Sequence, residues 1–316
     1  MKQIKFLATS LFTMAIVASC DFTEECQYQS RLNVHNNWQN YEVTPESNQV
    51  VSYGINNYRV GPVSTSTNAN EQADSASFTL PFGSYRVLTY TDEPFSLRTK
   101  IDTQSLNDPE TAFAYVETAP VDLQDGRNLN NPQFPGYFYS SYNTGDLNVR
   151  VPVSCAAIQR LHTRFVRFLY NIVYEYDGSP DVKSLTTELS GVATQLRLKS
   201  GEGVPASAMT VYARPELTEI YDQQAETYSS YYINQISALS FLPQTGNNAA
   251  VNNTIRVNAY LDDFTVRTAS LNLSDYFDTF TDNFVSINID VVIEKSGIHL
   301  ELAAWELGIW KEFIIK

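Results

Sequence analysis

The side chains able to perform acid–base or metal chemistry are scattered along this chain. Its only histidines are His35, His162 and His299, and His299 alternates with apolar residues as it would on a solvent-facing strand. No Gly-x-Ser-x-Gly, His-Glu-x-x-His or phosphate-cradling glycine motif is present. We therefore expect neither a zinc site nor a Ser-His-Asp triad, and we expect no metal, no cofactor and no enzymatic activity.

Acidic residues are abundant, with 35 Asp and Glu against 21 Lys and Arg. Asp275, Asp278 and Asp282 share one segment and Asp262-Asp263 lies upstream, but the spacing differs from that of a calcium-binding loop, so we expect a solvated acidic face. No pair of carboxylates is singled out for glycoside hydrolysis. The formal net charge of −14 predicts that the protein does not bind nucleic acid, which requires clustered Lys and Arg.

The clearest chemical signal is a cysteine at the end of the first twenty residues. Lys2 and Lys5 precede a mostly apolar run over residues 6–16, which is shorter than the roughly 20 residues that span a bilayer. A basic start, an apolar stretch and small residues are typical of an export signal. The run Val-Ala-Ser-Cys, ending at Cys20, resembles a bacterial lipobox. That resemblance implies that the Cys20 thiol receives a diacylglyceryl group and becomes the first mature residue; the alternative is an ordinary signal peptide with a chance cysteine.

Residues 1–19 are thus predicted to be a lipoprotein signal peptide, and residues 20–26 a lipidated tether. Each buried CH₂ contributes about 0.8 kcal/mol and one acyl chain binds only marginally, so a multiply acylated Cys20 would hold the protein on outer-membrane lipid. The acidic residues within 21–25 resemble a cluster associated with surface export in Bacteroidetes lipoproteins, although a solvated tether also suits them. We expect a lipid-anchored protein of the outer membrane, exposed at the cell surface.

Two cysteines remain once Cys20 is assigned to lipid. In an oxidising compartment, Cys26 and Cys155 can pair in a disulfide that joins the start of the body to its middle. The alternative is one thiol in the tether and one buried thiol in the body. The sequence leaves both possibilities open.

The body is predicted to consist of β-strands, because 20 Tyr and 17 Phe accompany abundant Thr, Val and Asn. Alternating apolar and polar residues predict strands around Leu32 and over residues 113–116, 147–153, 163–176, 255–261, 287–293 and 298–302. The predicted strand over residues 147–153 contains Pro152, which has no backbone N–H donor and therefore favours the edge of a sheet. Residues 65–70 are predicted to be an exposed loop, and residues 216–227 one or two helical turns.

Several short strands with turn signals argue for β-sandwiches. We place an N-terminal sandwich at residues 27–157 and a C-terminal sandwich at residues 158–316. In the polar stretch that includes the predicted loop, Asp74-Ser75-Ala76 resembles the O-glycosylation motif of Bacteroidetes, which makes Ser75 a candidate acceptor.

The most informative run of the body covers residues 78–90. Two strands flank a Pro-Phe-Gly turn in which Gly83 is expected to supply backbone freedom, and the second strand is apolar on both faces, as a central strand would be. Behind a lipobox, Leu-Pro-x-Gly-x-Tyr-x-Val-Leu-x-Tyr resembles the fimbrillin and fimbrial-anchor lipoproteins of Bacteroidales. Residues 189–193 with 196–198 resemble the glycine-containing strand pair of that family's second domain. Similar turn–strand units also occur in other transthyretin-like or Ig-like sandwiches.

This resemblance implies an all-β protein with two tandem transthyretin-like or Ig-like β-sandwich domains. It implies an anchor or accessory subunit of a type V pilus-like fimbria that takes part in cell adhesion. The partners would be fimbrial subunits, joined by β-strand donation. Stalk subunits of the family lose their first strand to a protease that cuts after arginine. Arg31 and Arg59 each lie in a possible strand, which favours an anchor that keeps its lipid.

The alternative is a glycan-binding surface lipoprotein of a polysaccharide-uptake system. Such a binder needs exposed aromatic rings beside Asn, Asp or Gln. Two groups of residues could supply them: 137–139 with Tyr142-Asn143, and Tyr228 with Tyr231 and Tyr232. Ordinary core packing is the competing interpretation of these aromatics.

Overall fold

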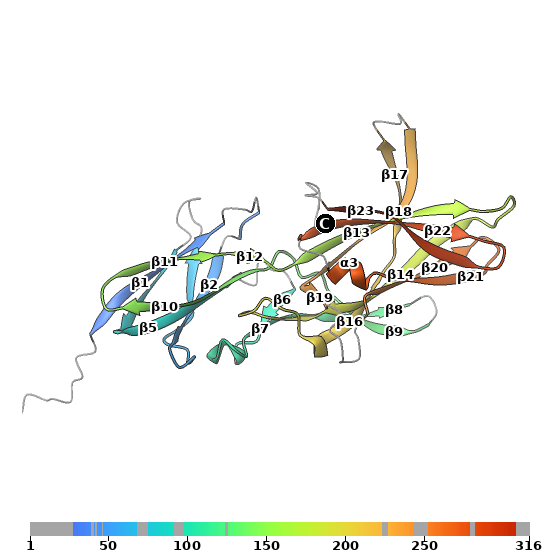
Figure 1. Cartoon of the computed structure of the whole chain (residues 1–316). Coiled ribbons are helices and arrows are strands. Elements are labelled where there is room, and N and C mark those ends of the chain that lie inside the picture. The colour runs from blue at the N-terminus through green and yellow to red at the C-terminus, as the bar shows by residue number, and fades with distance from the viewer. Residues whose placement is uncertain are drawn as a thin grey trace, which may run out of the picture.

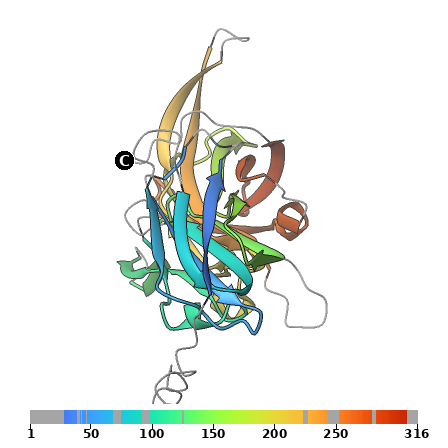
Figure 2. The ribbon, with the colours of Figure 1, turned by 90° about the vertical axis from the view of Figure 1, so that its left-hand side faces the viewer.

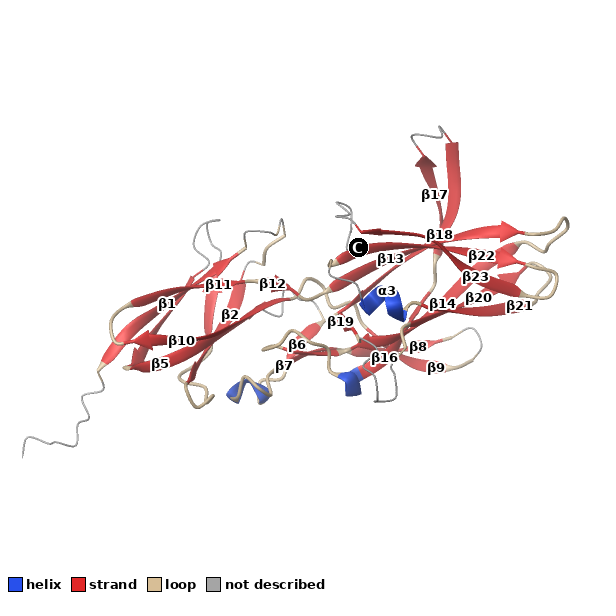
Figure 3. Cartoon of the chain, in the orientation of Figure 1, coloured by secondary structure: helices blue, strands red, loops and turns tan. Residues whose placement is uncertain are grey.

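The chain forms an elongated molecule in which two β-rich bodies follow one another (Figure 1). The computed structural model describes residues 28–38, 41, 43–45, 47–67, 75–91, 98–123, 126–222, 227–242, 252–278 and 282–307. Strands dominate these residues, and the helices among them are short (Figure 3): η1 (Ser105–Asn107), η2 (Pro205–Ser207) and α3 (Ser274–Asp278). The predicted all-β fold is therefore confirmed.

Two sheets make up the N-terminal body. The first has the order β11-β1-β4, with β1 (Gln29–Asn37), β4 (Ser75–Pro81) and β11 (Val153–Ile158). The second has the order β12-β10-β5-β2-β3, with β2 (Ser47–Gly54), β3 (Ser64–Thr67), β5 (Gly83–Thr91), β10 (Tyr139–Val149) and β12 (Arg160–Leu161). Side chains from both sheets, among them Leu32, Val34, Val50 and Val87, bury one shared core. This is the arrangement of a sandwich.

The C-terminal body also pairs two sheets across a core. One has the order β17-β18-β13-β22-β23, with β13 (Arg164–Tyr174), β17 (Glu216–Asp222), β18 (Thr227–Ala238), β22 (Phe284–Ile293) and β23 (Ile298–Leu307). The other has the order β16-β14-β20-β21, with β14 (Val182–Ala193), β16 (Ala208–Ala213), β20 (Thr254–Leu261) and β21 (Val266–Asn272), and β19 (Ser240–Phe241) pairs with β14. Val166, Phe168, Leu189, Val257 and Ile289 belong to the common core.

A segment from the first half of the sequence packs against the second half. β6 (Thr99–Ile101) and β7 (Phe113–Val116) form a sheet with β15 (Gln195–Arg197) in the order β15-β7-β6. The hairpin of β8 (Thr118–Asp122) and β9 (Asn128–Pro132) contacts β16. There the side-chain amide of Asn131 donates a hydrogen bond to the carbonyl of Tyr212 and accepts one from its backbone N–H. Strands from before residue 157 therefore pair with a strand from after it. The division into domains of residues 27–157 and 158–316 stays a prediction.

Two strand units predicted from the sequence divide between different sheets. β4 and β5 flank the Pro-Phe-Gly run but lie in separate sheets, so residues 81–83 form a corner. Gly83 is not among the glycines with positive φ, so the corner does not use the backbone freedom that was predicted for this residue. The predicted strand over residues 147–153 is interrupted at residues 150–152, where the chain passes from β10 to β11 in the other sheet. Alternation continues through the break, but Pro152 lies outside both ladders because it lacks an N–H donor.

Other strand predictions are confirmed, with three corrections. β1, β5, β7, β13, β20, β22 and β23 occupy the predicted positions, and β5 is buried between β2 and β10. Residues 65–67 of the expected loop belong to β3, because an edge strand can be polar. Residues 216–222 form β17 instead of helical turns, because cross-strand pairing with β18 overrides local preference. The β17–β18 hairpin projects from the body (Figures 1 and 2). Finally, the predicted strand pair of residues 189–193 and 196–198 does not form, because β15 pairs with β7 and not with β14.

Candidate ligand-binding cleft

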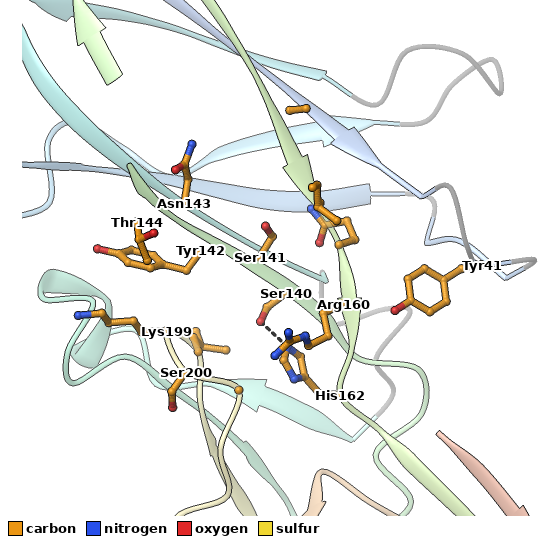
Figure 4. Close-up of a pocket in the computed structure, with 15 residues that line it drawn as sticks. Tyr41, Ser140, Ser141, Tyr142, Asn143, Thr144, Arg160, His162, Lys199 and Ser200 are labelled. Atoms are coloured by element: carbon orange, nitrogen blue, oxygen red, sulfur yellow. Dashed lines mark hydrogen bonds between the residues drawn. The ribbon is translucent and has the colours of Figure 1, made fainter. Parts of the chain in front are cut away.

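A cleft of about 610 Å³ opens where the N-terminal body meets a loop of the second half. Residues 140–144 of β10 line one side, Ala156, residues 158–160 and His162 line another, and the loop of residues 198–201 closes a third (Figure 4). Its volume falls within the range of roughly 300–1,000 Å³ found for small-molecule sites. The cleft is therefore large enough for a ligand of one or two sugar rings.

His162 forms the buried floor of this cleft. Its Nε2 lies 2.7 Å from Ser140 Oγ, and its backbone N–H donates to the carbonyl of Phe138. The ring packs against Gly201, where an added Cβ would lie 2.7 Å from Cε1 of His162 and where φ is +73°. Burial first, and then the charges of Arg160 and Arg164, lower the pKa of His162 to about 3. At neutral pH this side chain is uncharged and serves to shape the floor.

The charged groups of the lining are both cationic. Arg160 and Lys199 contribute side chains, and no aspartate or glutamate occurs among the described residues that line the cleft. Lys199 forms an ion pair with Glu110, which is outside the lining, and its Nζ lies 5.7 Å from the centre of the Tyr142 ring. Figure 4 shows the Arg160 guanidinium beside the His162 ring and Lys199 next to Tyr142. The two cations thus stand at different parts of the cleft.

Neutral polar groups complete the lining. Ser141, Asn143, Thr144 and Ser200 supply hydroxyl and amide groups, which suit the hydroxyls of a sugar. Gln159 is buried, and its Nε2 donates to Asn36 Oδ1 and Thr89 Oγ1, each at 2.7 Å. These bonds tie the segment before β12 to β1 and β5. The wall that carries Arg160 is therefore held in place by strands from both N-terminal sheets.

The structure separates the aromatic residues proposed as a platform. Tyr142 and Asn143 line the cleft, whereas two of residues 137–139 are buried, and Tyr137 packs on Phe165 with ring centres 5.0 Å apart. Tyr228 is exposed on β18, but Tyr232 of the same strand is buried in the C-terminal core. Core packing therefore explains part of the set, and only Tyr142-Asn143 joins the cleft.

The cysteines and the predicted glycosylation site lie away from the cleft. Cys20 and Cys26 are outside the described residues, so lipidation and the pairing of Cys26 with Cys155 stay predictions. Cys155 is half-buried on β11, and burial raises the pKa of its thiol. Ser75 begins β4 and is partly buried, and its glycosylation likewise stays a prediction.

The other candidate groups for chemistry are dispersed. His35 is exposed on β1, and His299 lies on β23 between the carboxylates of Glu294 and Glu301, which raise its pKa. The aspartates at 262–263 lie in the β20–β21 turn, away from those on α3. Within the described ranges, no three His, Cys, Asp or Glu side chains gather closely enough to hold a metal. In the same ranges, no helix is long and apolar enough to cross a membrane.

Sequence reasoning did not identify Arg160, Lys199 or Gly201. Their positions in the sequence carry no motif, and they meet only because the second half of the chain folds back onto β10 and β12. Of the cleft residues, only the pair Tyr142-Asn143 was recognisable from its aromatic and amide types.

Neither the known family models nor the curated proteins include a match to this sequence. Solved structures do match. A putative adhesin from Bacteroides ovatus is 13% identical, with a TM-score of 0.57 over 87% of this chain and 93% of that chain. A putative adhesin from Bacteroides thetaiotaomicron is 11% identical, with a TM-score of 0.56 over 84% and 91%. Putative polysaccharide binding proteins of the same species are 12% identical, with a TM-score of 0.55 over 89% and 99%. The chain therefore shares its two-body β fold with these proteins, in agreement with the fold expected from the fimbrillin-like resemblance.

Proposed function

We propose that the protein is a lipid-anchored surface subunit for cell adhesion, namely the anchor or an accessory subunit of a fimbria. The observation that carries this proposal is the shared fold with the Bacteroides ovatus putative adhesin, which extends over 87% of this chain. β1 begins at the end of the N-terminal body that lies away from the C-terminal body (Figure 1). A tether from Cys20 would therefore direct the C-terminal body away from the membrane.

Assembly by strand donation requires a groove that an extended segment can fill. β1 lies between β4 and β11 and pairs with both, and its Leu32 and Val34 are completely buried. Cleavage after Arg31 would remove only the first three residues of β1, whereas cleavage after Arg59 would remove β1 and β2 together and leave β4 and β11 without the strand that lies between them. A neighbouring subunit could then add its own strand in that place. A chain that keeps β1 fills its own groove, as a membrane-proximal anchor would.

Metabolic labelling and N-terminal sequencing test the anchor proposal. Labelled palmitate should enter the wild-type protein and not a Cys20→Ala variant, and the mature N-terminus should be blocked at Cys20. The protein should also co-purify with other fimbrial subunits from the cell surface. A mature chain that starts just after Arg59 would lack β1 and would refute the anchor.

Glycan binding is a second candidate function, and the cleft is the observation that favours it. A structurally similar protein from Bacteroides thetaiotaomicron carries the description of a putative polysaccharide binding protein. Affinity electrophoresis against plant and host glycans should show retardation of the wild-type protein. Tyr142→Ala should abolish that retardation, whereas Tyr228→Ala, which changes an exposed tyrosine outside the cleft, should not.

A further inference from the structure

We propose that the cleft recognises a negatively charged sugar of an acidic glycan, with Arg160 as the group that binds the anion. This inference rests on the glycan-binding candidate and adds the class of ligand. It concerns the side chains of the cleft and is independent of how the protein is anchored.

The first support is a local reversal of charge. Over the whole chain, 35 acidic residues outnumber 21 basic ones. The cleft lining instead contains two basic side chains and, among its described residues, no acidic one. A neutral ligand gains little from this arrangement, whereas an anion is attracted to it and is repelled by most of the remaining surface.

The second support is the difference between the two cations. The charge of Lys199 is offset by Glu110, and the cation–π contact with Tyr142 holds it at the edge of the cleft. Arg160 is exposed on β12, and in the described part of the chain no carboxylate pairs with it. A guanidinium offers a planar fork of donors that matches a carboxylate or sulfate. Arg160 is therefore the anion-binding group.

The third support is the rigidity and neutrality of the floor beneath Arg160. His162 is held by Ser140 and by the close approach of Gly201, and an added Cβ at Gly201 would lie 3.8 Å from Nη1 of Arg160. Because the imidazole is uncharged at neutral pH, Arg160 is the cationic group at this floor. The hydroxyl and amide groups of Ser141 and Asn143 remain to bind the hydroxyls of the same sugar.

Binding measurements on the full-length protein in detergent test this proposal. The probes are polygalacturonate, which carries carboxylates, dextran sulfate, which carries sulfates, and neutral dextran. We expect the wild-type protein to bind one or both anionic polymers and not dextran. Arg160→Gln should weaken this binding about tenfold or more, the effect of losing a charge-assisted hydrogen bond. Arg150→Gln is the matched control, because Arg150 is exposed and does not line the cleft.

The outcomes separate the two proposals. Binding of dextran as tight as that of the better-bound anionic polymer, or unchanged binding by Arg160→Gln, would overturn the anionic ligand; the glycan-binding candidate would survive if Tyr142→Ala still abolished binding. Absence of binding to every glycan would overturn both. If Arg160→Gln does not fold, elution of the wild-type protein from polygalacturonate by galacturonate, and not by galactose or by sodium chloride of equal ionic strength, would support the proposal. Equal elution by sodium chloride would overturn it.

Discussion

The hydroxyl of Tyr85 donates a hydrogen bond of 2.7 Å to the backbone carbonyl of Pro81, across the corner that joins β4 to β5. The Tyr85 ring lies against Gly83, where an added Cβ would be 3.3 Å from the hydroxyl and 3.4 Å from two ring carbons. The spacing Pro-x-Gly-x-Tyr therefore has a physical basis. The glycine leaves room for a ring that folds back and fastens the corner between the two sheets of the N-terminal body.

Tyr85→Phe should lower the free energy of unfolding by about 1–2 kcal/mol, because the Pro81 carbonyl loses its side-chain donor while the ring stays buried. Urea denaturation followed by circular dichroism measures this change. Tyr58→Phe is the matched control, since Tyr58 is 74% exposed and should tolerate the same change. Equal stability of Tyr85→Phe and the wild type would show that the hydrogen bond does not secure the corner.

Sequence alone predicts the strands whose burial alternates, and β20 and β22 are the clearest cases because apolar side chains at every second position face one core. It does not show where the chain changes sheets, because alternation continues through residues 150–152. It also does not show the cleft. Arg160 and Lys199 are 39 positions apart in the sequence and line one cleft only because the two bodies pack together.

His162 should make the protein sensitive to acid. Its pKa falls from 6.5 to about 3 on folding, so between these values the unfolded chain binds a proton that the folded chain does not. The free energy of unfolding should therefore decrease as the pH falls from 6.5 toward 3, by up to about 5 kcal/mol from this group. Above pH 6.5 the contribution is complete and constant.

The test compares urea denaturation at pH 7 and pH 4 for the wild type and His162→Gln. The variant should lose less stability between the two pH values, because the other titrating groups are unchanged. His35→Gln, which alters an exposed histidine on β1, should keep the wild-type difference. If His162→Gln lost as much stability on acidification as the wild type, burial of this imidazole would not be the cause.

The β8–β9 hairpin should be held on the second half of the chain partly by charge. Arg127 Nη2 lies 2.6 Å from Glu188 Oε1 on β14, and the Glu188 side chain is only 10% exposed. Arg127→Ala, Glu188→Ala and the double variant form a cycle that should give a coupling energy of about 1–3 kcal/mol. Lys100 and Glu117, each 37% exposed, should give about 0.2–1 kcal/mol in the same experiment. Coupling no larger than that of this exposed pair would mean that the ion pair does not hold the hairpin.

Phe264 occupies the turn between β20 and β21 in a conformation that suits asparagine or glycine. Its φ is +66° and its side chain is 98% exposed, so its ring gains almost no burial. A left-handed backbone costs a non-glycine residue about 1–2 kcal/mol, and asparagine tolerates it better. Phe264→Asn should therefore raise the free energy of unfolding by about 0.5–1 kcal/mol in thermal or urea denaturation. Val266→Asn places the same side chain on β21, where no such strain exists, and should not stabilise. A lower stability of Phe264→Asn would show that the exposed ring itself supports the turn.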